Sequence, residues 1–253
     1  MLIGKKIFNL QKSYGPKINL KYSIKTSREI GAINMKLNSF KQYDLVIFDC
    51  DGVLIDSNLF KCEAFGKSVS EYPDNIVESF VDHCKKTFGV SRYVKFREFF
   101  NEFAIESFDE TKYQLFLNRY ANLCKGLYHE ADLTPSVERA LSLLNHSGYK
   151  LFVASGSDEE ELIEVFEKRN LINYFINIYG SPKKKTECVS VILEDNPGLK
   201  AVLIGDALSD LEVSKEHNLD FIYMSKYTVQ SKEQDKICRN EAKIVIDTLE
   251  DLF

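Results

Sequence analysis

The stretch Asp44-Leu-Val-Ile-Phe-Asp-Cys-Asp-Gly-Val-Leu-Ile-Asp-Ser57 decides the fold. Its apolar run from Leu45 to Phe48 is closed by Asp49 and then by Gly52, a pattern that predicts a strand buried on both faces of a parallel sheet and followed by a tight turn. Similar short apolar runs recur later in the chain and predict further strands, at residues 150–155, 175–180, 200–206 and 220–224.

Helical signals separate the main runs. Thr134 before Pro135 predicts a helix with a threonine N-cap and proline at its first position, ending near Gly148. The acids of Asp158-Glu-Glu-Glu161 predict the start of another helix, because negative charge is favoured in a first turn. This alternation implies an α/β fold with a doubly wound, mostly parallel sheet, to which residues 243–247 add a late edge strand.

A long insert without a convincing strand, residues 58–132, separates the first two predicted strands. Its apolar residues recur three or four positions apart, which predicts helices over 75–88, 93–103 and 111–123. We interpret its phenylalanines as the core of a small helical bundle: Phe96, Phe99, Phe100 and Phe103. We therefore expect a basic N-terminal extension (1–42), a core domain (43–57 and 133–253) and a small helical domain (58–132).

Composition narrows the class of protein. The chain has 253 residues, 44% of them hydrophobic, which is enough for a sizeable core, yet no apolar run approaches the roughly 18 residues of a membrane span. Residues 7–10 do not continue into a secretory signal, so we expect a cytoplasmic protein with no membrane partner. The six cysteines show no zinc-binding spacing and are expected to be reduced thiols.

Charge is distributed unevenly along the chain. The net charge is −5, but residues 1–42 contain nine basic side chains and one acid, which leaves about −13 for the remainder. A nucleic acid is therefore not expected to bind the main body, because both would be negative.

Acids and hydroxyls follow the predicted strands. Asp49 and Asp51 follow the first, Ser155 the second, and Asp206 and Asp210 a later one. Open α/β sheets bind ligands where the carboxyl ends of their strands meet, so these side chains should converge on one crevice. Clustered carboxylates repel one another, and an oxygen-only ligand set indicates Mg²⁺ as the cation that neutralises them.

Four segments resemble, in the right order, the four motifs of the haloacid dehalogenase-like superfamily: Phe48–Ser57, Ala154–Ser157, Ser181–Lys185 and Ile204–Asp210. The resemblance covers about residues 43–225. It is strongest for the superfamily members with a helical cap between motifs one and two, such as phosphoglycolate phosphatases and beta-phosphoglucomutases. It implies a Rossmann-like catalytic core with the insert as an inserted small helical cap domain.

The resemblance also implies roles for individual residues. Asp49 would be the nucleophile and a Mg²⁺ ligand, forming an aspartyl-phosphate intermediate. Asp51 would act as general acid and base and would bind the metal through its backbone carbonyl. Ser155 and the Gly156 amide would bind the transferring phosphoryl group.

A lysine near Asp49 would offset the negative charge of the phosphoryl group. Residues 183–185 are all lysines, and we favour Lys185 as the catalytic and phosphate-binding one because Thr186-Glu187 starts a helix that would direct it inward. Asp206 would ligate Mg²⁺, and Asp210 would support Asp206 or bind the ion through water.

These roles describe a Mg²⁺-dependent phosphatase acting on a small phosphomonoester, either a sugar phosphate or a phosphoglycolate-like metabolite. Asp51 argues against dehalogenase and phosphonate-cleaving activities, whose enzymes usually lack a second acid in this motif. A sugar phosphomutase, and a non-catalytic binding protein that retains the fold, stay open as alternatives. The sequence leaves the exact substrate and the oligomeric state open.

Overall fold

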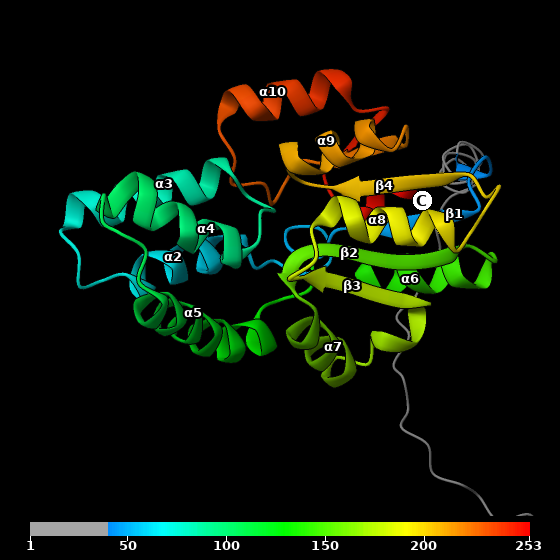
Figure 1. The fold of residues 1–253 in the computed structure, drawn as a ribbon. Coiled ribbons are helices and arrows are strands. Elements are labelled where there is room, and N and C mark those ends of the chain that lie inside the picture. The colour runs from blue at the N-terminus through cyan, green and yellow to red at the C-terminus, as the bar shows by residue number, and fades with distance from the viewer. Residues whose placement is uncertain (1–39) are drawn as a thin grey trace, which may run out of the picture.

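A six-stranded parallel sheet forms the centre of the computed structural model, which describes residues 40–253, with the strand order β3-β2-β1-β4-β5-β6 (Figure 1). The strands are β1 (Leu45–Phe48), β2 (Lys150–Asp158), β3 (Asn177–Ser181), β4 (Ala201–Gly205), β5 (Asp220–Met224) and β6 (Ile244–Ile246). The doubly wound parallel sheet predicted from the sequence is confirmed, including its late edge strand. Of the predicted N-terminal extension, residues 1–39 lie outside the described residues.

Helices cover both faces of this sheet. One face packs against α6 (Val137–His146), α7 (Glu159–Lys168) and the 3₁₀ turns η2 (Ile172–Tyr174) and η3 (Leu249–Leu252). The other packs against α8 (Lys185–Glu194), α9 (Leu208–Glu216) and α10 (Lys232–Glu241). Because successive side chains of a strand point to opposite faces, β1 contributes Val46 and Phe48 to the first core and Leu45 and Ile47 to the second.

The predicted start of the first core helix was wrong. α6 begins at Val137, and Thr134 does not cap it; the Thr134 hydroxyl donates to the Val53 carbonyl oxygen instead. The Thr134 amide also donates to the Leu54 carbonyl oxygen at 3.0 Å, so this segment is held against the turn that follows β1. The predicted end of the helix was close, since α6 stops at His146, two residues before Gly148.

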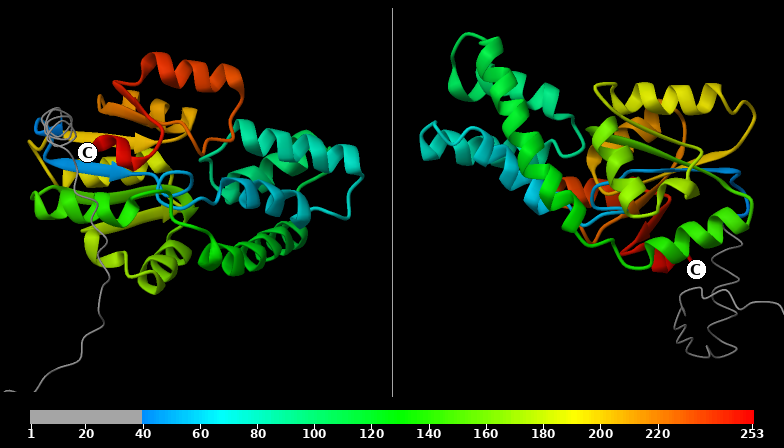
Figure 2. Two further views of the ribbon diagram at one scale, coloured as in Figure 1. Left: turned by 180° about the vertical axis from the view of Figure 1, so that it is seen from behind. Right: turned by 90° about the horizontal axis from the view of Figure 1, so that it is seen from below.

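The helical insert, residues 58–132, contains α2 (Asn58–Ser68), α3 (Asp74–Lys86), α4 (Arg92–Glu98), the π-helix η1 (Phe99–Ala104) and α5 (Glu110–Glu130). Its core is aromatic, as predicted: Phe96, Phe99 and Phe100 are fully buried and Phe103 packs against them. The strands point toward this insert (Figure 1). Seen from behind and from below, it lies at the end of the sheet and covers neither of its faces (Figure 2).

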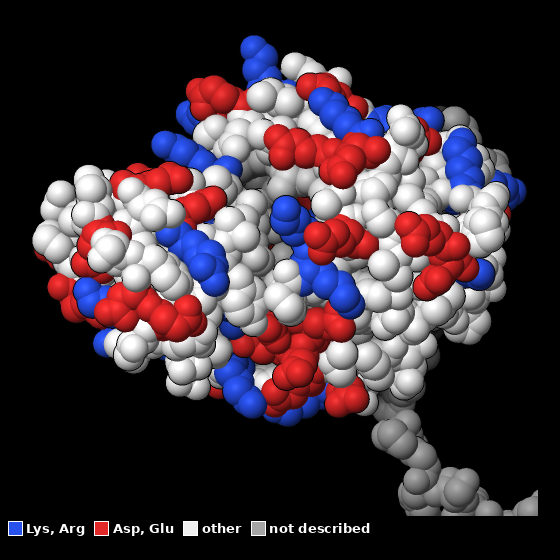
Figure 3. Space-filling view, viewed as in Figure 1, with Lys and Arg blue, Asp and Glu red and all other residues white. Residues whose placement is uncertain are grey.

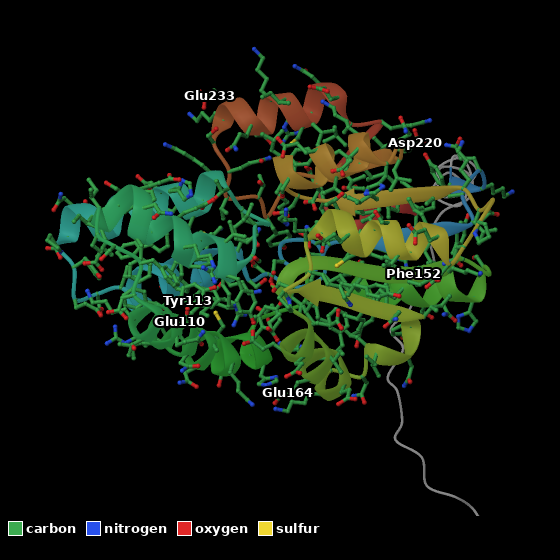
Figure 4. The ribbon with its side chains drawn as sticks, viewed as in Figure 1. Glu110, Tyr113, Phe152, Glu164, Asp220 and Glu233 are labelled. Carbon is green, nitrogen blue, oxygen red and sulfur yellow. The ribbon has the colours of Figure 1, made fainter. Side chains whose placement is uncertain are left out.

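Polar contacts join the insert to the carboxyl end of the sheet. They connect Arg92 with Glu161, Tyr93 with Asp158, the Ser209 hydroxyl with the Phe88 carbonyl, and Lys125 with Glu164. Acidic side chains gather over the seam between α5 and α7 (Figure 3), and Glu164 lies at its outer side (Figure 4). The insert is therefore closed against the core in this structure.

The sequence also predicted reduced cysteines and the absence of a membrane-spanning segment. All six cysteines lie within the described residues as buried, unpaired thiols, as expected. Within residues 40–253 the helices lack the length and apolar character that crossing a membrane requires.

Candidate active site

Three buried carboxylates meet at the carboxyl ends of the two central strands. Asp49 follows β1 and Asp206 follows β4, and these strands pair in register from Leu45 with Ala201 to Phe48 with Ile204. Asp210 reaches the same point from the first turn of α9. Each of the three aspartates offers an oxygen within 4.8 Å of the others.

The cluster has unused coordinating capacity. Asp49 Oδ2 and Asp206 Oδ1 are buried without a hydrogen-bond partner, whereas the second oxygen of Asp206 accepts from Asn58 Nδ2 at 2.7 Å. Burial raises the pKa of Asp49 to about 7, with the neighbouring acids adding to the shift and Lys185 opposing it. Burial and the Asp49 charge also raise the pKa of Asp206 well above its usual range. These carboxylates fit a hard divalent cation such as Mg²⁺.

The raised pKa of Asp49 predicts how stability depends on pH. Since the folded chain holds this proton more tightly than the unfolded chain, the stabilisation is complete below about pH 4 and is lost as the pH rises to about 7. In metal-free buffer, thermal unfolding should show the wild type losing stability relative to Asp49→Asn over this window, by a few kcal/mol at most. Glu63→Gln, at an exposed site, is the control. Parallel pH curves for the wild type and Asp49→Asn would contradict the expectation.

Lys185 supplies positive charge beside the cluster. As the first residue of α8 it is buried, and its Nζ lies 3.0 Å from Asp49 Oδ1 and 2.5 Å from Asp210 Oδ1. Although burial opposes it, the charges of Asp210 and Asp49 raise the pKa of Lys185, which stays protonated. Lys183 instead lies 3.9 Å from Glu159, and Lys184 is exposed, so of the three lysines Lys185 is the one beside Asp49.

The Asp51 carboxylate, two residues after Asp49, accepts hydrogen bonds from four side chains. Lys61 Nζ lies 2.7 Å from its carboxylate, and Ser57, Ser157 and Tyr128 donate hydroxyl hydrogen bonds of 2.5, 2.5 and 2.7 Å. Burial alone would raise the pKa of Asp51, but Lys61 and the hydroxyls outweigh it and lower the pKa. Asp51 is therefore ionised in this arrangement.

Two glycines allow the backbone to approach neighbouring groups closely at this site. Gly52 has φ +75°, and a Cβ there would lie 2.3 Å from Asn58 Nδ2 and from Asp206 Oδ2. A Cβ on Gly156 would lie 2.1 Å from the Gly89 carbonyl oxygen, where the insert touches the end of β2. Larger residues at either position would displace the turn or the insert.

A small hollow of about 30 Å³ lies between the insert and the sheet. Its core side includes Asp49, Asp51, Ser155, Gly156 and Ser157, and its insert side includes Lys61, Phe65, Phe88, Gly89, Arg92 and Lys95. The structure thus brings Ser155 and Gly156 to the same space as Asp49 and Asp51. Asp206, Asp210 and Lys185 do not line the hollow but lie next to Asp49. Sequence reasoning missed several polar side chains at this site: Ser57, Asn58, Lys61, Arg92, Lys95, Tyr128 and Ser157.

Comparisons with known proteins agree with this geometry. The family model described as haloacid dehalogenase-like hydrolase matches residues 46–224. A phosphoglycolate phosphatase from Psychrobacter arcticus is 25% identical over 195 residues, which cover 72% of this chain and 83% of that protein.

Solved structures share the fold. A predicted phosphatase from Clostridium acetobutylicum superposes with a TM-score of 0.65 at 24% identity, covering 83% of this chain and 96% of that one. A beta-phosphoglucomutase from Clostridium difficile gives a TM-score of 0.65 at 20% identity, covering 83% and 93%. At these identities the structural likeness establishes the fold alone.

Proposed function

This chain belongs to the haloacid dehalogenase-like hydrolase family, and we propose that it is a Mg²⁺-dependent phosphatase of a small phosphomonoester, acting through an aspartyl-phosphate on Asp49. One observation carries the proposal. Asp49 Oδ1 is 3.0 Å from the Lys185 ammonium, while its Oδ2 is buried without a hydrogen-bond partner at a hollow large enough only for a small group. A carboxylate placed in this way suits nucleophilic attack on phosphorus.

The proposed reaction has two displacement steps, and the residues around Asp49 bind the phosphoryl group in both. An Asp49 oxygen forms the new bond to phosphorus while the bond to the ester oxygen breaks, and water then cleaves the aspartyl-phosphate in a second displacement. Ser155 and the Gly156 amide bind the phosphoryl oxygens, and Lys185 offsets their charge. Asp49, Asp206, Asp210 and the Asp51 carbonyl would hold Mg²⁺, which would supply further positive charge at these oxygens.

Asp51 acts as the general acid and the general base. It donates a proton to the leaving oxygen in the first step and removes one from the attacking water in the second. The charge of Lys61 and three hydroxyl hydrogen bonds keep it ionised in this arrangement. It must therefore take up a proton, and loosen its contact with Lys61, before it can act as an acid.

The helical insert acts as the cap in this proposal. Ligand pockets usually measure about 300 to 1,000 Å³, far more than the hollow of about 30 Å³ between insert and sheet, so substrate binding requires the insert to move away from the core. Closure over a small substrate excludes water from the reacting groups. A short phosphomonoester requires less displacement of the insert than a hexose phosphate does, and on this ground we favour hydrolysis of a short ester over the sugar phosphomutase alternative.

The test is turnover of a panel of phosphorylated metabolites by the purified protein. We expect phosphate release with Mg²⁺, loss of activity on chelation with EDTA, and recovery when Mg²⁺ is added back, because the acids around Asp49 would otherwise repel a phosphate dianion. Product analysis separates phosphate release from isomerisation that depends on a bisphosphate primer. Full activity in metal-free buffer would contradict the metal requirement, and absence of turnover on every ester would favour a non-catalytic protein.

A further inference from the structure

Three buried cations come from the insert side of the hollow. Lys61, Arg92 and Lys95 are exposed to only 4%, 5% and 1%. Two of them have carboxylate partners: Lys61 is paired with Asp51, and Arg92 forms a two-bond ion pair with Glu161 of α7. The charges of Lys61 and Arg92 are therefore balanced by acids of the core.

Lys95 differs from the other two. Within residues 40–253 no carboxylate lies within ion-pair distance of its Nζ, which donates one hydrogen bond, to the Cys84 carbonyl oxygen at 2.9 Å. Its ammonium lies 4.8 Å from the ring centre of Phe65 and 5.6 Å from that of Phe88, both of which also line the hollow. Glu98, on the same helix, is instead bonded to His83 at 2.9 Å.

An unpaired ammonium in such a place is costly to the fold. Burying a charge without a counter-ion loses its hydration, and aromatic faces recover only part of that loss. Burial correspondingly lowers the pKa of Lys95. A leucine or methionine would fill the same space among phenylalanines at a lower free-energy cost. A charge at this position is therefore best explained by an anion that is not part of the chain and binds next to Lys95.

We propose that the substrate supplies this anion, and that Lys95 binds a carboxylate carried by the phosphomonoester. The proposal rests on the phosphatase function above, since it assumes that Asp49 and Ser155 bind the phosphoryl group on the core side of the hollow. The second anion then lies on the insert side, next to Lys95.

The size of the hollow limits the distance between the two anions. Asp49 and Lys95 line the same small hollow, so a phosphate beside Asp49 and a carboxylate beside Lys95 must lie close together, as a short carbon chain allows. A carboxylate is also smaller than a second phosphate. The substrate class is therefore a phosphoester of a two- or three-carbon hydroxy acid, and neutral sugar phosphates are expected to be poor substrates.

The experiment compares esters that differ in the carboxylate alone. The pairs are 2-phosphoglycolate with 2-hydroxyethyl phosphate, and 3-phosphoglycerate with glycerol 3-phosphate. The wild type should show a kcat/KM about 10- to 100-fold higher for the carboxylate member of at least one pair, the range expected for a hydrogen bond between charged groups. In Lys95→Met this ratio should fall to about one, and Lys95→Arg should retain part of it.

Two further measurements separate binding from a structural role. Lys95→Met should unfold at a higher temperature than the wild type without ligand, because an apolar side chain replaces an unpaired cation, yet it should lose the stabilisation that 2-phosphoglycolate gives. Lys67→Met, at an exposed site on α2, should leave both quantities unchanged. Lys95→Gln serves the same purpose if the methionine variant does not fold.

The outcomes distinguish this inference from the function on which it rests. Turnover with equal kcat/KM for both members of each pair, or a ratio that Lys95→Met and Lys95→Gln leave unchanged, would show that Lys95 is a structural cation and would leave the phosphatase proposal standing. Absence of turnover on every ester, the neutral ones included, would overturn both.

Discussion

Asp49→Asn is expected to lose turnover by about 10⁴- to 10⁶-fold, the range seen when an enzyme loses its covalent nucleophile. The amide keeps the shape of the carboxylate. Its oxygen can still accept from the Cys50 amide, which donates to Asp49 Oδ1 at 2.8 Å, so the turn should fold normally. What the variant lacks is the negative oxygen that attacks phosphorus.

The measurement combines steady-state turnover with detection of the intermediate. After rapid acid quenching, mass spectrometry of the wild type should find one phosphoryl group on the peptide that contains Asp49, and the variant should carry none. Asp56→Asn is a matched control, because it changes an exposed acid of the same loop. Near wild-type turnover by a folded Asp49→Asn protein would refute the mechanism.

The core half of the site could be predicted from the sequence because its geometry follows from the sheet. Buried parallel strands read as continuous apolar runs, and their carboxyl ends must lie along one edge, so acids that follow different strands have to meet there. The sequence favoured Lys185 but left Lys183 and Lys184 open, because all three precede the same predicted helix. In the structure α8 begins at Lys185, and the Lys185 ammonium lies beside Asp49.

The insert half could not be predicted in the same way. Periodicity identified its helices and its phenylalanine core, but how these helices dock on the sheet depends on contacts between distant residues, such as Arg92 with Glu161. One local signal was available. Arg92 and Lys95 lie four residues before Phe96 and Phe99, on the apolar face of the helix, and charges at core-facing positions are errors unless they serve a function.

Asp51→Asn should have the second largest effect, and its size should depend on the leaving group. Without a proton donor, turnover of an alkyl phosphate should fall by about 10²- to 10⁴-fold. p-Nitrophenol leaves readily as its anion, so formation of the phosphoenzyme from p-nitrophenyl phosphate needs no such donor and should be slowed much less. Attack by water, which needs Asp51 as base, should be slow for every substrate.

These two effects together predict an initial burst of nitrophenolate release, followed by slow turnover. With p-nitrophenyl phosphate, Asp51→Asn should release about one nitrophenolate per active site and then turn over slowly, as the aspartyl-phosphate on Asp49 accumulates.

The substitution also leaves the buried ammonium of Lys61 without its ion-pair partner, which alone weakens the fold. The double variant Asp51→Asn/Lys61→Met removes that unpaired charge and should show the same burst with higher stability. Equal losses on alkyl and nitrophenyl esters in both variants, with no burst, would mean that Asp51 positions the turn through its four hydrogen-bond donors and transfers no proton.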